Sequence, residues 1–146
     1  MGTFTKTFTP TADCIVTESY LYSPVELNTS KDVKRVKISR TLWDTGASCS
    51  LISERIAKLL NLEPIGKTGV TGYNSNIDIK DTYLIHAGLP TGDIVTNIMA
   101  MACESDEYDA IFGMDIISLG DFAITNQNGQ TTFSFRIPSS QTIEFK

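Results

Sequence analysis

The chain has 146 residues, of which 41% are hydrophobic and 20% are charged, and its formal net charge is −5. This length favours one compact domain with a core large enough to need no disulfide or metal. The composition excludes a disordered or collagen-like chain. The acidic charge opposes binding to phosphate backbones and anionic membranes, so no nucleic acid is expected as a partner.

The first ten residues are rich in threonine and contain no apolar run of the kind found in signal peptides. We therefore expect residues 1–10 to form a polar N-terminal arm and residues 11–146 to form a single domain in a cytoplasmic protein. The sequence has no run of about eighteen apolar residues, so membrane insertion is not expected. Three cysteines are too few for a disulfide framework.

Short segments rich in β-branched and aromatic residues predict a mainly β fold. In chain order, strands are expected at residues 14–17, 20–27 and 33–42. Near the C-terminus, the dipeptide at positions 128 and 129 is Asn-Gly, which predicts a hairpin between strands at residues 122–125 and 131–137. A last, shorter alternation predicts a strand at residues 142–145.

Helix is expected in two places only. Residues 53–61 have Ser53 as a possible N-cap, and Ile56, Leu59 and Leu60 fall on one face, which predicts an amphipathic helix. A second, shorter helical turn is expected to start at Asp115 and to end before Gly120.

The segment richest in chemical information is the turn that follows the predicted strand at residues 33–42. Asp44 stands there at the end of a rigid element, and Gly46 allows the chain to pass close to other backbone. An Asp-Thr-Gly tripeptide alone is also compatible with an ordinary turn. The flanking residues are therefore needed to decide its role.

Residues 42–48, Leu-Trp-Asp-Thr-Gly-Ala-Ser, resemble the active-site loop of retropepsin-like aspartic proteases. Residues 110–115, Ala-Ile-Phe-Gly-Met-Asp, are similar to the family's hydrophobic-hydrophobic-Gly segment, which passes beside the catalytic loop. Residues 120–129 are similar to a hairpin near the end of such domains. The resemblance implies a mainly β, retropepsin-like closed β-barrel half of the acid-protease fold. One short helix would follow the active-site loop, and one would lie near the C-terminal part.

The resemblance also implies roles for individual residues. Asp44 would be catalytic, and Thr45 and Gly46 would support the loop, with Thr45 forming a hydrogen bond across a dimer axis. Residues 68–79 would form a flap over the substrate, and the alternative interpretation is an ordinary surface hairpin. Ser48 departs from the family, whose members often carry an acidic residue there. The substrate-binding residues implied are Ala47, Ser48, Gly72, Tyr73, Ile111, Phe112 and Gly113.

Acid-protease chemistry needs two carboxylates that share a proton, and this chain has one Asp-Thr-Gly. A C2 homodimer would bring the two Asp44 side chains together. We therefore expect an aspartic endopeptidase whose partners are a peptide or protein substrate and a second copy of the chain, with no metal and no cofactor. The alternative is an inactive retropepsin-like domain that dimerises or binds peptide.

The other acidic residues are expected to be structural. Asp115 is interpreted as a helix cap, and Asp121 as a solvated loop residue. Four carboxylates at residues 104–109 are also interpreted as solvated, because the ligand spacing of an EF-hand is absent. A pairing of Asp44 with Asp115 inside one chain is a further possibility.

Three other residues near or outside the loop have simple interpretations. Trp43 is expected in the core beneath the loop, and Cys49 is expected to pack at the edge of the cleft. His86 is the single histidine, which excludes a metal site built from several histidines.

Overall fold

The computed structural model describes residues 2–8, 15–24, 34–71 and 74–146. The predicted mainly β class is confirmed, with one short helix after the 44–50 segment and one in the C-terminal part. In chain order the elements are β1 (Gly2–Phe8), β2 (Val16–Tyr22), β3 (Arg35–Trp43), β4 (Leu51–Ser53), α1 (Glu54–Leu59), β5 (Gly66–Thr71), β6 (Ile77–Gly88), β7 (Ile94–Cys103), β8 (Ala110–Phe112), α2 (Met114–Ile117), β9 (Asp121–Gln127) and β10 (Gln130–Ile137).

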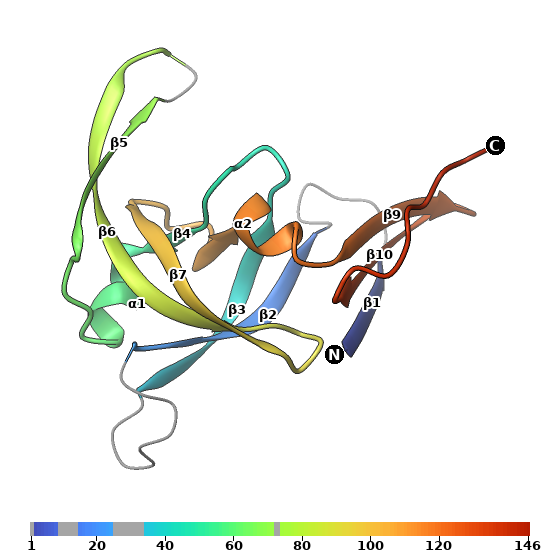
Figure 1. Ribbon diagram of the computed structural model, residues 1–146, viewed down its shortest axis with the longest axis horizontal. Coiled ribbons are helices and arrows are strands. Elements are labelled where there is room, and N and C mark those ends of the chain that lie inside the picture. Colours follow the sequence, from blue (N-terminus) through green and yellow to red (C-terminus); the bar gives the residue numbers. More distant parts are fainter. Residues whose placement is uncertain (1, 9–14, 25–33, 72–73) are drawn as a thin grey trace.

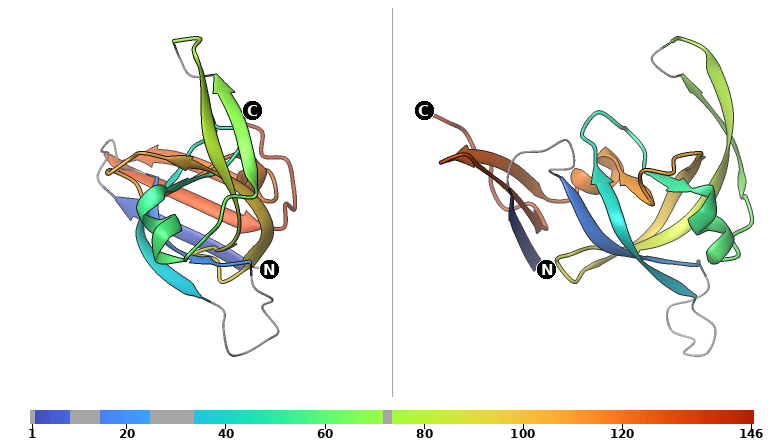
Figure 2. Two further views of the ribbon diagram at one scale, coloured as in Figure 1. Left: turned by 90° about the vertical axis from the view of Figure 1, so that its left-hand side faces the viewer. Right: turned by 180° about the vertical axis from the view of Figure 1, so that it is seen from behind.

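The strands form two sheets. The larger sheet has the strand order β2-β3-β8-β4-β7-β6-β5. Because β2 also pairs with β6, the six strands from β2 to β6 in this order form a ring of pairings. Beyond this ring, β5 and the facing part of β6 stand out as a hairpin (Figure 1). The smaller sheet has the order β1-β10-β9 and lies to one side of the ring, as the view from behind in Figure 2 shows.

The segment expected as a polar arm contains a paired strand. β1 runs antiparallel to β10 over its whole length, from Gly2 opposite Ile137 to Phe8 opposite Thr131. The Phe4 ring meets the Phe133 ring edge-on at a centroid distance of 6.1 Å. Phe4 and Phe8 lie on the half-buried face of β1, with Lys6 between them, and this face packs against the rest of the protein despite the threonines on the other face.

The other strand predictions are confirmed only in part. One strand, β2, replaces the two expected at residues 14–17 and 20–27, and residues 25–33 lie outside the described residues. The hairpin is confirmed: Asn128 and Gly129 both have positive φ, 55° and 73°, as a tight two-residue turn requires. The strand predicted at residues 142–145 is wrong, because this segment has no strand partner and its Phe145 is 91% exposed.

Both helices are present. In α1, Ser53 is the N-cap and its Oγ accepts a hydrogen bond from the Ile56 amide at 3.3 Å, as predicted. α2 is a single turn that starts one residue before Asp115, with Gly113 as its N-cap. Among the described residues, neither helix has the length and apolar character needed to cross a bilayer.

Trp43 joins the two sheets. Its side chain is fully buried, and its ring packs against Phe112 of β8 at a centroid distance of 5.3 Å and against Phe135 of β10 at 4.8 Å. Its indole N–H donates to the Thr17 hydroxyl at 2.9 Å, so the one polar atom of the ring is satisfied. The core position predicted for Trp43 is confirmed, and the residue directly before Asp44 is thereby immobilised.

Asp121 fastens the C-terminal segment to the small sheet. Its carboxylate accepts hydrogen bonds from Arg136 Nε at 2.6 Å, Ser139 Oγ at 2.6 Å and the Ser140 amide at 2.9 Å. These donors, Ser139 first, hold the pKa of Asp121 well below its usual value. The expected solvated loop residue is thus a structural anchor, because its donors come from a strand and a segment that follow it in the chain.

Replacing Trp43 with alanine should lower the free energy of unfolding by about 3–5 kcal/mol, because it removes the ring that fills the space between the sheets. Urea denaturation followed by circular dichroism measures this change, since Trp43 is the only tryptophan and the variant has no fluorescence signal of its own. Phe145→Ala is the control, because that ring is exposed and should cost almost nothing. Equal losses in the two variants would contradict the central position given to Trp43.

Replacing Asp121 with asparagine should destabilise the fold in a pH-dependent manner. Because the folded-state pKa lies below the usual 3.8, the contribution of Asp121 is complete above that pH and is lost as the pH falls through the folded-state pKa. The stability difference between wild type and variant should therefore shrink as the pH is lowered from neutral to below 3.8. Asp106→Asn, at an exposed loop position, should show no such trend; a difference independent of pH at Asp121 would refute the assignment.

Candidate active site

The 44–50 loop joins β3 to β4 and lies against β8. β3 pairs in parallel with β8, from Thr41 opposite Ala110 to Trp43 opposite Phe112. The pairing continues one step into the loop, where the Asp44 amide donates to the Phe112 carbonyl at 2.9 Å. The two motifs singled out in the sequence are therefore neighbours, and the second fixes the backbone of Asp44.

The loop holds the Asp44 carboxylate with its own backbone. The Gly46 amide donates to Asp44 Oδ1 at 2.8 Å, and the Ala47 amide donates to the Asp44 carbonyl at 3.2 Å. A Cβ at position 46 would lie 3.1 Å from Asp44 Oδ1, so glycine leaves room for the carboxylate. Asp44 is half-buried, whereas Thr45 and Gly46 are exposed. The tip of the loop is thus available to a second molecule.

Gly113 lies under the loop. A Cβ added there would lie 2.7 Å from both the Ala47 and the Cys49 carbonyl oxygens, closer than real Cβ contacts allow. Next to it, the Met114 amide donates to the Ala47 carbonyl at 2.7 Å. Glycine is therefore required where the end of β8 passes beneath the loop, and the contribution of Gly113 in the single chain is to support that loop.

Asp115 does not cap α2, contrary to the prediction. Its carboxylate accepts hydrogen bonds from the Ser50 amide at 2.9 Å and the Ser50 hydroxyl at 2.7 Å, and one from the Ile116 amide at 3.0 Å. Ser50 was not among the predicted site residues. Its small polar side chain directly before an apolar strand was the one available signal. The Asp115 oxygens are thus engaged by Ser50 and Ile116 rather than by Asp44.

The remaining predicted site residues differ in how exposed their side chains are. Ala47 and Ile111 are half-buried and Ser48 is exposed, so these side chains remain available to a substrate. Phe112 is buried against Trp43, so its side chain cannot touch a substrate, and it contributes to the site through its carbonyl. Gly72 and Tyr73 lie outside the described residues.

The segment predicted as a flap lies on the β5–β6 hairpin. The hairpin register pairs Gly69 with Ile79 and Thr71 with Ile77. The two isoleucine side chains are 64% and 69% exposed. The two isoleucines are two residues apart in β6, so their side chains lie on the same face of the projecting hairpin.

The other acidic and sulfur-containing residues are accounted for structurally. Asp109 is buried and forms an ion pair with Arg55 of α1, and its carboxylate also accepts from the Arg40 amide at 3.1 Å. The prediction of a fully solvated 104–109 cluster is therefore wrong for its last residue, because an arginine from a distant helix reaches it. Cys49 is a free, exposed thiol beside Ser48. In the ranges that the structure describes, no three His, Cys, Asp or Glu side chains gather as a metal site.

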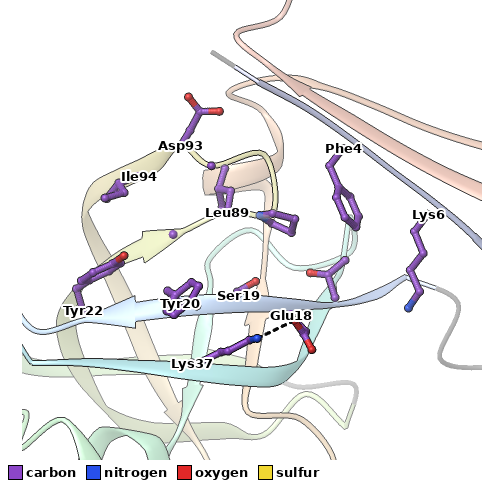
Figure 3. A pocket seen from close by; sticks show the side chains of 14 residues that line it. Phe4, Lys6, Glu18, Ser19, Tyr20, Tyr22, Lys37, Leu89, Asp93 and Ile94 are labelled. Atoms are coloured by element: carbon purple, nitrogen blue, oxygen red, sulfur yellow. Dashed lines mark ion pairs between the residues drawn. The ribbon is translucent and has the colours of Figure 1, made fainter.

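A cavity of about 800 Å³ lies apart from the loop. It is lined by side chains of β1, β2 and β3 and by the turn between β6 and β7, among them Phe4, Tyr20, Tyr22 and Leu89 (Figure 3). The turn lies on the side of the molecule opposite the 44–50 loop in Figure 1. None of the predicted site residues lines this cavity.

Comparisons with known proteins agree with this architecture. No family model matches the chain, and no match was found among curated proteins. Among solved structures, the chain is similar to a retropepsin-like aspartic protease from Rickettsia conorii, with a TM-score of 0.53 and 15% sequence identity over 90% of this chain and 91% of that chain. This likeness shows that the chain has the retropepsin-like fold that the sequence motifs implied.

Replacing Gly113 with alanine should lower the free energy of unfolding by about 1–3 kcal/mol, because the new methyl group would overlap the Ala47 and Cys49 carbonyls. Gly66→Ala is a matched control, since a Cβ there meets no atom within 4 Å. Urea midpoints of the two variants measure the difference. A Gly113→Ala protein as stable as Gly66→Ala would contradict the close approach of the loop.

Proposed function

We propose that the protein is an aspartic endopeptidase in which Asp44 of two identical subunits forms the catalytic pair. The observation that carries the proposal is the position of Asp44 in an exposed loop whose backbone is held by the second motif, in a chain with a single Asp-Thr-Gly. One subunit supplies one such carboxylate. An isologous C2 contact through the loop is the simplest way to supply the second.

Two carboxylates about 3 Å apart cannot both be ionised, so they share one proton. The ionised member accepts a proton from a water molecule, whose oxygen then forms a bond to the scissile carbonyl carbon. The protonated member donates a hydrogen bond to the carbonyl oxygen, and a proton passes to the nitrogen as the carbon–nitrogen bond breaks. The reaction forms no covalent enzyme intermediate and needs no metal or cofactor.

The surrounding residues fit supporting roles. The exposed Thr45 can donate and accept hydrogen bonds at once, which suits a contact between two identical loops across an axis. Ala47 and Ser48 follow Asp44 in the loop, and Ile111 lies on β8, which pairs with the strand that leads to Asp44. An extended peptide would run past these three side chains. The β5–β6 hairpin would cover the substrate as a flap, with Ile77 and Ile79 supplying apolar contact. Gly72 and Tyr73, which lie outside the described residues, are proposed to bind substrate as well.

Replacing Asp44 with asparagine should lower kcat for peptide cleavage by at least about a hundredfold, because the variant cannot form the proton-sharing pair. The measurement is digestion of a broad peptide library at several pH values, read by mass spectrometry. Asp106→Asn is the matched control, because it makes the same chemical change at an exposed loop position. Retained cleavage in the Asp44 variant would defeat the proposal, and a wild type that binds peptides without cutting them would favour the inactive alternative.

Mixing wild-type and Asp44→Asn subunits tests the shared site directly. After subunit exchange in equal amounts, about a quarter of the dimers carry two intact carboxylates, so the rate should fall to about a quarter of that of the same total amount of wild type. Independent monomers would retain about half. A rate of one half would therefore contradict a catalytic pair shared between subunits.

A further inference from the structure

We propose that Ser50 and Asp115 are positioning residues that hold the 44–50 loop in the shape in which Asp44 can pair with its mate. This inference rests on the proposed function and adds two residues to it, neither of which touches substrate. Ser50 ends the loop and Asp115 lies in the single turn of α2, so their contact ties the far end of the loop to the helix that follows the second motif.

The Ser50 hydroxyl is buried and acts both as a hydrogen-bond donor and as an acceptor in this contact. Ser50 is buried, and its hydroxyl donates to Asp115 Oδ1 at 2.7 Å while it accepts from the Gly113 amide at 3.1 Å. Its own amide donates to Asp115 Oδ2 at 2.9 Å. Both carboxylate oxygens thus receive a donor from one residue, which fixes the position and the direction of the chain at Ser50.

Asp115 is suited to this task because it is an acceptor with two oxygens. Its Oδ1 also accepts from the Ile116 amide at 3.0 Å, which orients the carboxylate relative to α2. Hydrogen bonds to a carboxylate are stronger than those between neutral groups. The Met101 amide of β7 donates to the Ser50 carbonyl at 3.1 Å, so Ser50 is also held from the sheet.

The loop is held at its two ends and at one place between them. At its start the Asp44 amide binds the Phe112 carbonyl, and in the middle the Met114 amide binds the Ala47 carbonyl. Ser48 and Cys49, between Ala47 and Ser50, are exposed. Without the contact to Asp115, the end of the loop would be held only by the Met101 amide at Ser50 and by the Met114 amide at Ala47.

A small displacement of this loop has a large effect on the distance between the two Asp44 carboxylates, because the proposed site is symmetric. A shift of the loop in one subunit is repeated in the other, so the displacement of one carboxylate relative to its mate can be twice that of either. Misplacement of a catalytic group by about 1 Å can cost about a hundredfold in rate. A contact that sets the loop's path therefore acts on kcat more than on the binding of peptide.

The test compares Ser50→Ala, Asp115→Asn and the double variant with wild type in steady-state peptide cleavage. We expect kcat to fall about tenfold to a hundredfold in each single variant, with KM changed by less than about twofold. The double variant should lose about as much kcat as the more impaired single variant, because both substitutions remove the bond between the Ser50 hydroxyl and the Asp115 carboxylate. Ser139→Ala is the matched control, since that serine also donates to an aspartate, Asp121, at 2.6 Å but away from the loop.

A second measurement follows the loop itself. Amide hydrogen exchange should become faster in the 44–50 segment of Ser50→Ala and Asp115→Asn, and should stay unchanged there in Ser139→Ala. An active wild type with equally active Ser50 and Asp115 variants would overturn the positioning role and leave the proposed function intact. Faster exchange without a loss of kcat would overturn it as well. A wild type that cleaves no peptide would instead overturn the proposed function, and the catalytic role of this contact with it.

Discussion

The position of β8 between β3 and β4 is the constraint on which the rest of the site depends. β8 pairs in parallel with β3 on one side and antiparallel with β4 on the other. The 44–50 loop connects those two strands, so it must cross the end of β8 to reach from one to the other. Glycine at position 113 permits this crossing, because any side chain would meet the loop's carbonyl oxygens. The loop that presents Asp44 is thus a consequence of strand order.

Local sequence patterns predicted those features whose cause is local. The Asn128-Gly129 hairpin and the Ser53 N-cap depend on backbone angles or on a contact within three residues, and both are present. The fold class also followed from residues close in sequence, because two ordered motifs carried the resemblance. The predicted strand at residues 142–145 failed because a short alternation cannot supply the partner strand that a sheet needs.

The acidic residues show which contacts cannot be predicted from local sequence patterns. Asp109, Asp115 and Asp121 each lie next to the end of a predicted strand or helix, which favours an interpretation as caps or solvated loop residues. In the folded chain their donors come from Arg55, Ser50 and Arg136, which are between 15 and 65 residues away. No pattern in the sequence indicates contacts between residues so far apart in the chain. Of the candidate site, the two motifs and the support that Gly46 gives to the Asp44 loop could therefore be predicted, whereas the contact between Ser50 and Asp115 could not.

Two ionisable side chains, Asp121 and His86, make the stability of the fold depend on pH in different parts of the acid range. The pKa of Asp121 is held low by its donors, so its contribution to stability is lost only in strong acid. Burial lowers the pKa of His86, whose Nδ1 accepts from the Asn97 amide at 3.0 Å, so the neutral ring is the form that fits β6 and β7. The contribution of His86 is complete above its usual value of 6.5 and is lost as the pH falls through the lower folded-state pKa. A protonated Nδ1 cannot accept a hydrogen bond from the Asn97 amide, so acid weakens the contact between β6 and β7 at the end of β6 remote from the β5–β6 hairpin.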